Sequence, residues 1–183
     1  MIKLHDQFNL GERPMKNSRN ICLAFLATIF VGGAFANPQE GEPAPAFRLQ
    51  DQNSIWHELE DFAGQWLVLY FYPKADTPGC TTEACEFRDN IFAYEELGAA
   101  IVGVSVDDVA SQKDFADKYH LPFPLLSDAN KVVAESYGVL RESGVANRQS
   151  FIIDPQGQVA KRYYQVSPAD HSAEVLEDLK ILM

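Results

Sequence analysis

Two long apolar runs dominate the pattern of hydrophobic and polar positions along this chain. They cover residues 66–72 and 100–106, and neither alternates with polar residues. Continuous apolar runs of this length, rich in β-branched and aromatic residues, are typical of strands buried on both faces of a sheet. Each run is followed by turn-forming residues and then by a segment of helical composition, which predicts a β-α-β-α order.

Shorter segments complete the predicted fold. Residues 47–49 and 54–59 are predicted to form an N-terminal β-hairpin around a polar turn, and residues 149–153 and 159–164 a second hairpin around Asp-Pro-Gln-Gly. Residues 121–126 are predicted to be a short strand or an extended connector. Helices are predicted over residues 78–97, 111–119, 130–137 and 167–183. This order predicts an α/β three-layer sandwich, with a mixed central sheet and helices on both faces.

The N-terminal 36 residues differ in composition from the rest of the chain. Residues 21–36 form an uncharged apolar run that follows basic residues and closes on a small-x-small site. This layout is typical of a secretory signal peptide, and an uncleaved anchor is the competing interpretation. The sequence therefore predicts a signal peptide over residues 1–36, of which 1–14 are an over-extended start. It further predicts one domain over residues 37–183 and an exported, periplasmic location.

Composition and charge narrow the function classes. The chain has 183 residues, of which 46% are hydrophobic and 22% charged, as expected for one ordinary globular domain after the N-terminal segment. A formal net charge of −11 argues against binding to nucleic acid through its phosphates. Beyond residue 36 two cysteines remain, Cys80 and Cys85. Two cysteines in an exported protein would ordinarily indicate a structural disulfide.

The placement of Cys80 points to a reactive thiol instead. It lies where a predicted buried strand passes through a turn into the start of a helix. Unpaired backbone N–H groups and the positive end of the helix dipole favour a thiolate there. Thr77 can bring a hydroxyl to the sulfur, although alone it would be read as an N-cap. Pro73 would shield the sulfur from water. Arg148 is the candidate cation, although an isolated arginine more often forms a surface ion pair.

Cys85 follows Cys80 by five residues. On an ideal helix this spacing separates the two Cα atoms by roughly 8 to 9 Å, whereas a disulfide needs less than about 7 Å. A static disulfide would therefore require a non-helical segment, and a dynamic one would require the first turns to unwind after Cys80 has reacted. A metal site is disfavoured because two thiolates without a nearby histidine do not supply a tetrahedral ligand set. A C-x-x-C motif is absent.

These motifs resemble those of a known family. Pro73-x-x-x-Thr77-x-x-Cys80 resembles the active-site signature of the peroxiredoxins. The wider run from Tyr70 to Asp89 is similar to the bacterioferritin comigratory protein, or peroxiredoxin Q, branch. A second cysteine five residues after the first is also typical of that branch. The similarity covers most of residues 40–183 and includes Arg148-x-x-Phe151-x-Ile153-Asp154. It implies a thioredoxin-like fold.

The resemblance implies a thiol peroxidase that reduces hydrogen peroxide and organic hydroperoxides. Cys80 would attack the peroxide and become a sulfenic acid, which Cys85 would resolve as an intramolecular disulfide. A thioredoxin-type protein is the expected reductant, and the expected assembly is a monomer or weak dimer. Neither a redox cofactor nor a metal is expected, and no membrane contact is expected after signal cleavage.

Further site residues are carried over by position. The resemblance implies that Thr77 hydrogen-bonds the peroxide and the thiolate, that Arg148 stabilises the thiolate, and that Pro73 shields the site. Glu83 would steady the network around Arg148, whereas His171 is interpreted as structural or solvated.

Two other functions stay open at this point. One is an exported thiol–disulfide oxidoreductase acting on protein substrates, against which the missing C-x-x-C counts. The other is a thioredoxin-fold binding module without catalytic activity, which would require both thiols to be inert to peroxide.

Overall fold

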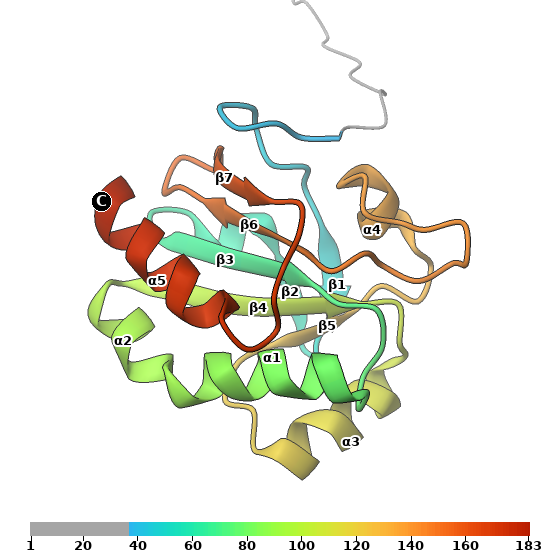
Figure 1. The fold of residues 1–183 in the computed structure, drawn as a ribbon. Coiled ribbons are helices and arrows are strands. Elements are labelled where there is room, and N and C mark those ends of the chain that lie inside the picture. Colours follow the sequence, from blue (N-terminus) through green and yellow to red (C-terminus); the bar gives the residue numbers. More distant parts are fainter. Residues whose placement is uncertain (1–36) are drawn as a thin grey trace, which may run out of the picture. The chain divides into compact units, whose positions relative to one another are not determined.

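The computed structural model describes residues 37–183, which Figure 1 shows as a mixed sheet surrounded by helices. The proposed signal peptide over residues 1–36 lies outside the described residues. The elements in chain order are β1 (Arg48–Gln50), β2 (Trp56–Glu58), the 3₁₀ helix η1 (Leu59–Phe62), β3 (Trp66–Phe71), α1 (Pro78–Asp89), α2 (Ile91–Glu96), β4 (Ala99–Ser105), α3 (Val109–Tyr119), β5 (Leu125–Ser127), α4 (Val132–Ser136), β6 (Gln149–Ile153), β7 (Val159–Tyr163) and α5 (His171–Leu182).

The two long apolar runs form the centre of the sheet. The strand order is β2-β1-β5-β4-β3-β6-β7. β3 and β4 are parallel, so the loops that follow them leave the sheet at the same edge. β6 runs antiparallel to β3, with Phe71 opposite Gln149. This register brings the residue before β6 next to the loop that follows β3, and these two segments carry the candidate active site.

Side chains of β3 alternate between the two faces of the sheet. Tyr70, together with Tyr72 directly after the strand, packs in a buried cluster with residues of α1, α2, α3 and α5. Leu69 and Phe71 point to the other face and pack in a second cluster with residues of α4. Figure 1 shows α4 well separated from α2 and α5. The predicted fold with helices on both faces is confirmed, and the N-terminal hairpin forms between β1 and β2.

The prediction of a single helix over residues 78–97 is wrong in one respect. The segment is broken at Asn90 into α1 and α2. The side-chain amide of Asn90 donates to the Glu86 carbonyl over 2.9 Å and to the Ser172 hydroxyl over 3.2 Å. The second contact comes from α5, so the break depends on a partner that is distant in sequence. An asparagine at such a point competes with the helix for backbone hydrogen bonds.

Two further boundaries differ from the sequence prediction. Within residues 121–126 only Leu125 and Leu126 join the sheet, in β5, because the two prolines that precede them lack backbone donors. The last helix begins at His171 rather than at residue 167. In the part of the chain that the structure describes, no helix combines the length and apolar character needed to cross a membrane.

Candidate active site

Cys80 occupies the first turn of α1. The helix starts with Pro78, and the preceding Thr77 is extended, with φ −98° and ψ 153°. The first intrahelical bond of this turn runs from the Thr81 N–H to the Thr77 carbonyl over 2.8 Å. The Cys80 N–H therefore lies among the unpaired donors of the helix start, where negative charge is favoured. The Cys80 side chain is only 1% exposed, so it is shielded from bulk water.

Arg148 reaches the sulfur from the other side of the site. It directly precedes β6, and its Nη2 donates a hydrogen bond to Cys80 Sγ over 3.2 Å. The absence of a side chain at Gly79 makes room for this approach, because a Cβ there would lie 3.2 Å from Nη2. The structure thus brings together a buried thiol, a helix start and a guanidinium, three features that favour a thiolate.

Glu83 is fully buried one turn after Cys80. Its Oε2 pairs with Nη1 of Arg148, and its Oε1 has no hydrogen-bond partner among the described residues. Burial raises the pKa of Glu83 to about 7, against the lowering effect of Arg148. Burial also acts to lower the pKa of Arg148, but Glu83 and Cys80 outweigh it and raise that pKa. The Arg148 guanidinium therefore contacts two groups that can carry negative charge, the Cys80 thiol and the Glu83 carboxyl group.

Thr77 uses its hydroxyl differently from an N-cap. The hydroxyl donates to the Lys74 carbonyl over 2.9 Å and makes no capping bond to the helix. The hydroxyl proton is engaged in this bond, whereas the oxygen lone pairs remain available to accept a hydrogen bond. Pro73, half-buried, stands at the start of the same loop.

Two acidic residues that the sequence did not single out for the site hold its loop in place. Asp107 accepts a hydrogen bond from the Ala75 N–H over 2.8 Å. Asp76 has a positive φ of 55° and binds Lys118 and Tyr119 at the end of α3, with contacts of 2.7 to 2.8 Å. A polar residue directly after a buried strand was the available signal for Asp107.

Cys85 lies half-buried on α1, and both Cys80 and Cys85 are free thiols. Because α1 is continuous over both positions, their Cα atoms are separated by roughly 8 to 9 Å, beyond disulfide reach. A Cys80–Cys85 bond would therefore require local unwinding of α1.

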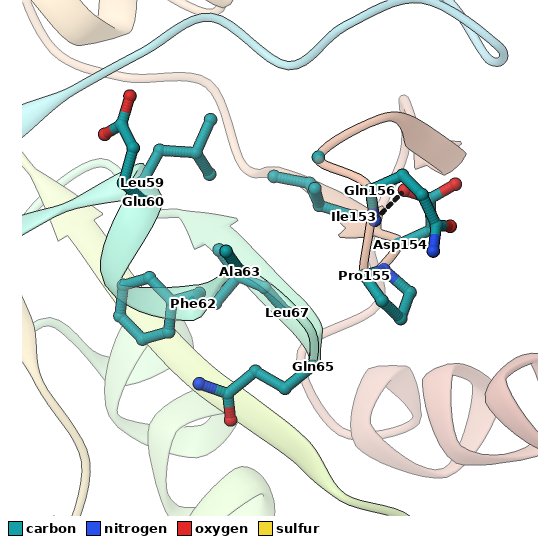
Figure 2. A pocket seen from close by; sticks show the side chains of 11 residues that line it. Leu59, Glu60, Phe62, Ala63, Gln65, Leu67, Ile153, Asp154, Pro155 and Gln156 are labelled. Carbon is teal, nitrogen blue, oxygen red and sulfur yellow. Dashed lines mark hydrogen bonds between the residues drawn. The ribbon is translucent and has the colours of Figure 1, made fainter.

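A cavity of about 240 Å³ lies away from these residues, between η1 and the β6–β7 turn (Figure 2). Leu59, Phe62, Leu67 and Ile153 give it a largely apolar lining, and Gln156 donates its backbone N–H to Asp154 in the turn beside it. Leu67 belongs to the start of β3, whereas Cys80 follows its end. The cavity is therefore separate from the thiol site.

Comparison with known proteins places this geometry in a family. Residues 41–162 match the AhpC/TSA family. Peroxiredoxin Bcp of Bacillus subtilis (strain 168) is 41% identical over 147 residues, which cover 76% of this chain and 94% of that protein. The chloroplastic peroxiredoxin Q of Populus jackii is 40% identical over 151 residues, which cover 81% of this chain and 71% of that protein.

Solved structures that resemble this chain are also peroxiredoxins. The peroxidoxin BcpB of Mycobacterium tuberculosis superposes with a TM-score of 0.75 at 35% identity, covering 80% of this chain and 99% of that one. The bacterioferritin comigratory protein of Xanthomonas campestris, described for its alkyl peroxide reduction activity, superposes with a TM-score of 0.71 at 35% identity. That match covers 74% of this chain and 90% of that one.

The predicted location is corrected by these relatives. The plant proteins are named chloroplastic, and neither they nor the Bacillus subtilis protein is named as an exported one. The prediction of an exported, periplasmic protein is therefore wrong.

The structural and sequence matches agree with the buried thiol at the start of α1. This chain belongs to the AhpC/TSA family as a peroxiredoxin related to the Bcp and Q proteins, and it is a thiol-dependent peroxidase.

Proposed function

We propose that Cys80 is the thiol that attacks the peroxide, and that the substrates are hydrogen peroxide and organic hydroperoxides. The observation that carries this proposal is the 3.2 Å hydrogen bond from Arg148 to the Cys80 sulfur at the start of α1. The thiolate forms a bond to the terminal peroxide oxygen while the O–O bond breaks. Cys80 becomes a sulfenic acid, and the departing alkoxide or hydroxide takes up a proton. The activity described for the Xanthomonas campestris relative supports alkyl peroxides as substrates.

Thr77, Arg148 and Pro73 position the two reactants. The Thr77 hydroxyl donates its hydrogen bond to the Lys74 carbonyl, and its oxygen accepts a hydrogen bond from the peroxide. Arg148 stabilises the thiolate and the charge that develops on the departing oxygen. Pro73 excludes water from the loop side of the sulfur.

Glu83 acts through Arg148. Its carboxylate pairs with Nη1 and leaves Nη2 directed at Cys80. An arginine fork offers this geometry because its N–H groups are fixed relative to one another. Glu83 is therefore a positioning residue for the cation and does not contact the peroxide.

Cys85 resolves the sulfenic acid as an intramolecular disulfide. The intact helix keeps the two sulfurs apart, so the first turns of α1 unwind after Cys80 has been oxidised. A thioredoxin-type protein then reduces the disulfide by thiol–disulfide exchange. The enzyme works as a monomer or weak dimer and uses no redox cofactor or metal.

The catalytic domain extends over residues 37–183. Arg162 on β7 supports this boundary, because its Nη1 donates to the Asn37 side chain over 2.6 Å and to the Pro38 carbonyl over 3.0 Å. The chain is thus attached to the domain from Asn37 onwards.

Mass spectrometry after one equivalent of peroxide tests the mechanism. The reduced protein should lose two hydrogen atoms, and peptide mapping should show a Cys80–Cys85 link. Cys85→Ser should stop one oxygen atom heavier, with the oxygen on Cys80. Cys22→Ser is the matched control and should keep full turnover. Full peroxide turnover by Cys80→Ser would contradict the proposal.

A further inference from the structure

Arg88 lies on the last turn of α1, three residues after Cys85. Its Nη1 donates to the Tyr119 carbonyl at the end of α3 over 2.7 Å. Its Nε donates to the Asp89 carboxylate over 2.8 Å. The side chain is 31% exposed, so the guanidinium is held in a fixed and partly desolvated position.

Arg88 and Cys85 lie on the same face of α1. Residues three apart share one face of a helix, which places Arg88 next to Cys85. The pKa of Arg88 is raised, chiefly by the hydrogen bond to Asp89 and to a smaller extent by the nearby Cys85. Among the described residues, Asp89 is the charged group that pairs with this guanidinium, and α3 contributes the uncharged Tyr119 carbonyl.

The end of α3 holds both ends of the segment that carries the two cysteines. Before Cys80, Asp76 is bound by Lys118 and by the Tyr119 hydroxyl. After Cys85, Arg88 is bound by the Tyr119 carbonyl. The first turn of α1 can therefore open while its last turn, with Arg88, stays attached to α3.

On the basis of the proposed Cys80–Cys85 disulfide, we infer that Arg88 serves the resolving step. It keeps the last turn of α1 against α3 and presents a positive charge to Cys85 while the preceding turns unwind. A cation near a thiol favours the thiolate, which is the nucleophile in disulfide formation. Arg148 would thus serve the thiol that reacts with peroxide, and Arg88 the thiol that reacts with the sulfenic acid.

In the step that Arg88 promotes, the Cys85 thiolate attacks the Cys80 sulfenic sulfur, the S–S bond forms and the S–O bond breaks. The departing hydroxide takes up a proton and becomes water. Cys85 is oxidised, the Cys80 sulfur is reduced from the sulfenic to the disulfide level, and the oxidising equivalent comes from the peroxide consumed before.

Rapid-mixing kinetics on the full chain separate the two steps. Arg88→Gln should leave the rate of Cys80 oxidation by hydrogen peroxide unchanged. It should slow disulfide formation at pH 7 by roughly three- to tenfold, as expected for the loss of one partly screened charge beside a thiol. Arg88→Lys should recover part of the lost rate, because it retains the charge but not the fork. Lys113→Gln removes an exposed cation elsewhere on α3 and is the matched control.

A second variant keeps the test valid if Arg88→Gln fails to fold. Asp89 is 61% exposed, and Asp89→Asn removes the carboxylate that competes for the guanidinium. This variant should form the disulfide faster than the wild type at pH 7. In a Cys22→Ser, Cys80→Ser background, iodoacetamide should alkylate Cys85 faster with Asp89→Asn and slower with Arg88→Gln at the same pH.

The inference is overturned if the Arg88 and Asp89 variants form the disulfide at the wild-type rate, if Arg88→Lys recovers nothing, or if Arg88→Gln slows both steps equally. Absence of a Cys80–Cys85 link in the wild-type protein after peroxide would instead overturn the proposed function. The wild-type measurement therefore separates the two failures.

Discussion

Nη2 of Arg148 donates a hydrogen bond to Cys80 Sγ across 3.2 Å, although the two residues lie 68 positions apart in the chain. Nη1 of the same guanidinium pairs with the buried Glu83. The cation is thus shared between a thiol and a carboxyl group.

Replacement of Arg148 should slow the reaction with peroxide. Arg148→Gln removes the donor to the sulfur, so the second-order rate constant for Cys80 oxidation should fall roughly 100-fold, comparable to the loss of one oxyanion donor. Arg148→Lys should recover only part of it, because lysine cannot pair with Glu83 and Cys80 through a fixed fork. Stopped-flow peroxide consumption measures both. The exposed Arg141, replaced by Gln, is the control and should keep the wild-type constant.

Replacement of Glu83 should change how stability depends on pH. Burial raises the pKa of Glu83 from 4.5 to about 7. Between these values the folded protein holds a proton that the unfolded chain releases, so this residue makes stability fall as pH rises. The free energy of unfolding of the wild type, minus that of Glu83→Gln, should therefore be smaller at pH 8 than at pH 5. Urea unfolding at both pH values measures it, with the exposed Glu96→Gln as control. An equal difference at the two pH values would contradict the pKa shift.

His171 should make stability depend on pH in the opposite direction to Glu83. Its ring is fully buried, and its Nε2 lies 2.8 Å from the Ser150 hydroxyl. Burial, helped by Arg148, lowers the pKa of His171 from 6.5 to about 4. Within this window the unfolded chain binds the extra proton, so stability is lost as pH falls from about 6.5 to about 4.

His171→Gln should remove this loss, so the unfolding free energy of the wild type minus that of the variant should be smaller at pH 4.5 than at pH 6.5; Glu83 titrates in both proteins and cancels in this difference. Urea unfolding at these two pH values checks the prediction, and the exposed His120→Asn is the control. An equal difference at the two pH values would refute the assignment to His171.

Arg162 should be important for stability and not for chemistry. It is 5% exposed, and its guanidinium lies over the rings of Phe151 and Tyr164. Among the described residues no carboxylate forms an ion pair with its side chain. Instead its side chain donates to Gln149, Asn37 and Pro38.

Arg162→Met leaves these acceptors unpaired, so the free energy of unfolding should fall by about 2 to 4 kcal/mol. Hydrogen exchange at residues 37–42 should increase. The control is Lys161→Met, a neighbour that is 35% exposed. Unchanged exchange at residues 37–42 in Arg162→Met would show that the arginine does not attach this segment to the domain.

Much of the fold could be predicted from sequence because its signals are local. The β3 run is continuously apolar, the β4 run is apolar up to its last residue, Ser105, and the first turn of α1 starts with a proline. The break at Asn90 and the buried state of His171 could not be predicted in this way. Both depend on α5 packing against α1, a contact between segments far apart in the chain.

The sequence by itself determined the position of Cys80 at a strand-to-helix junction, together with Pro73 and Thr77, because all three lie in one stretch whose geometry follows from local backbone preferences. The sequence offered Arg148 only as a candidate cation, and the tertiary structure decided that it faces the sulfur. Arg148 reaches Cys80 because β6 runs antiparallel beside β3, and such a pairing depends on contacts between distant segments. In the same way, the end of α3 brings the Tyr119 carbonyl to Arg88, and no local pattern in α1 encodes that contact.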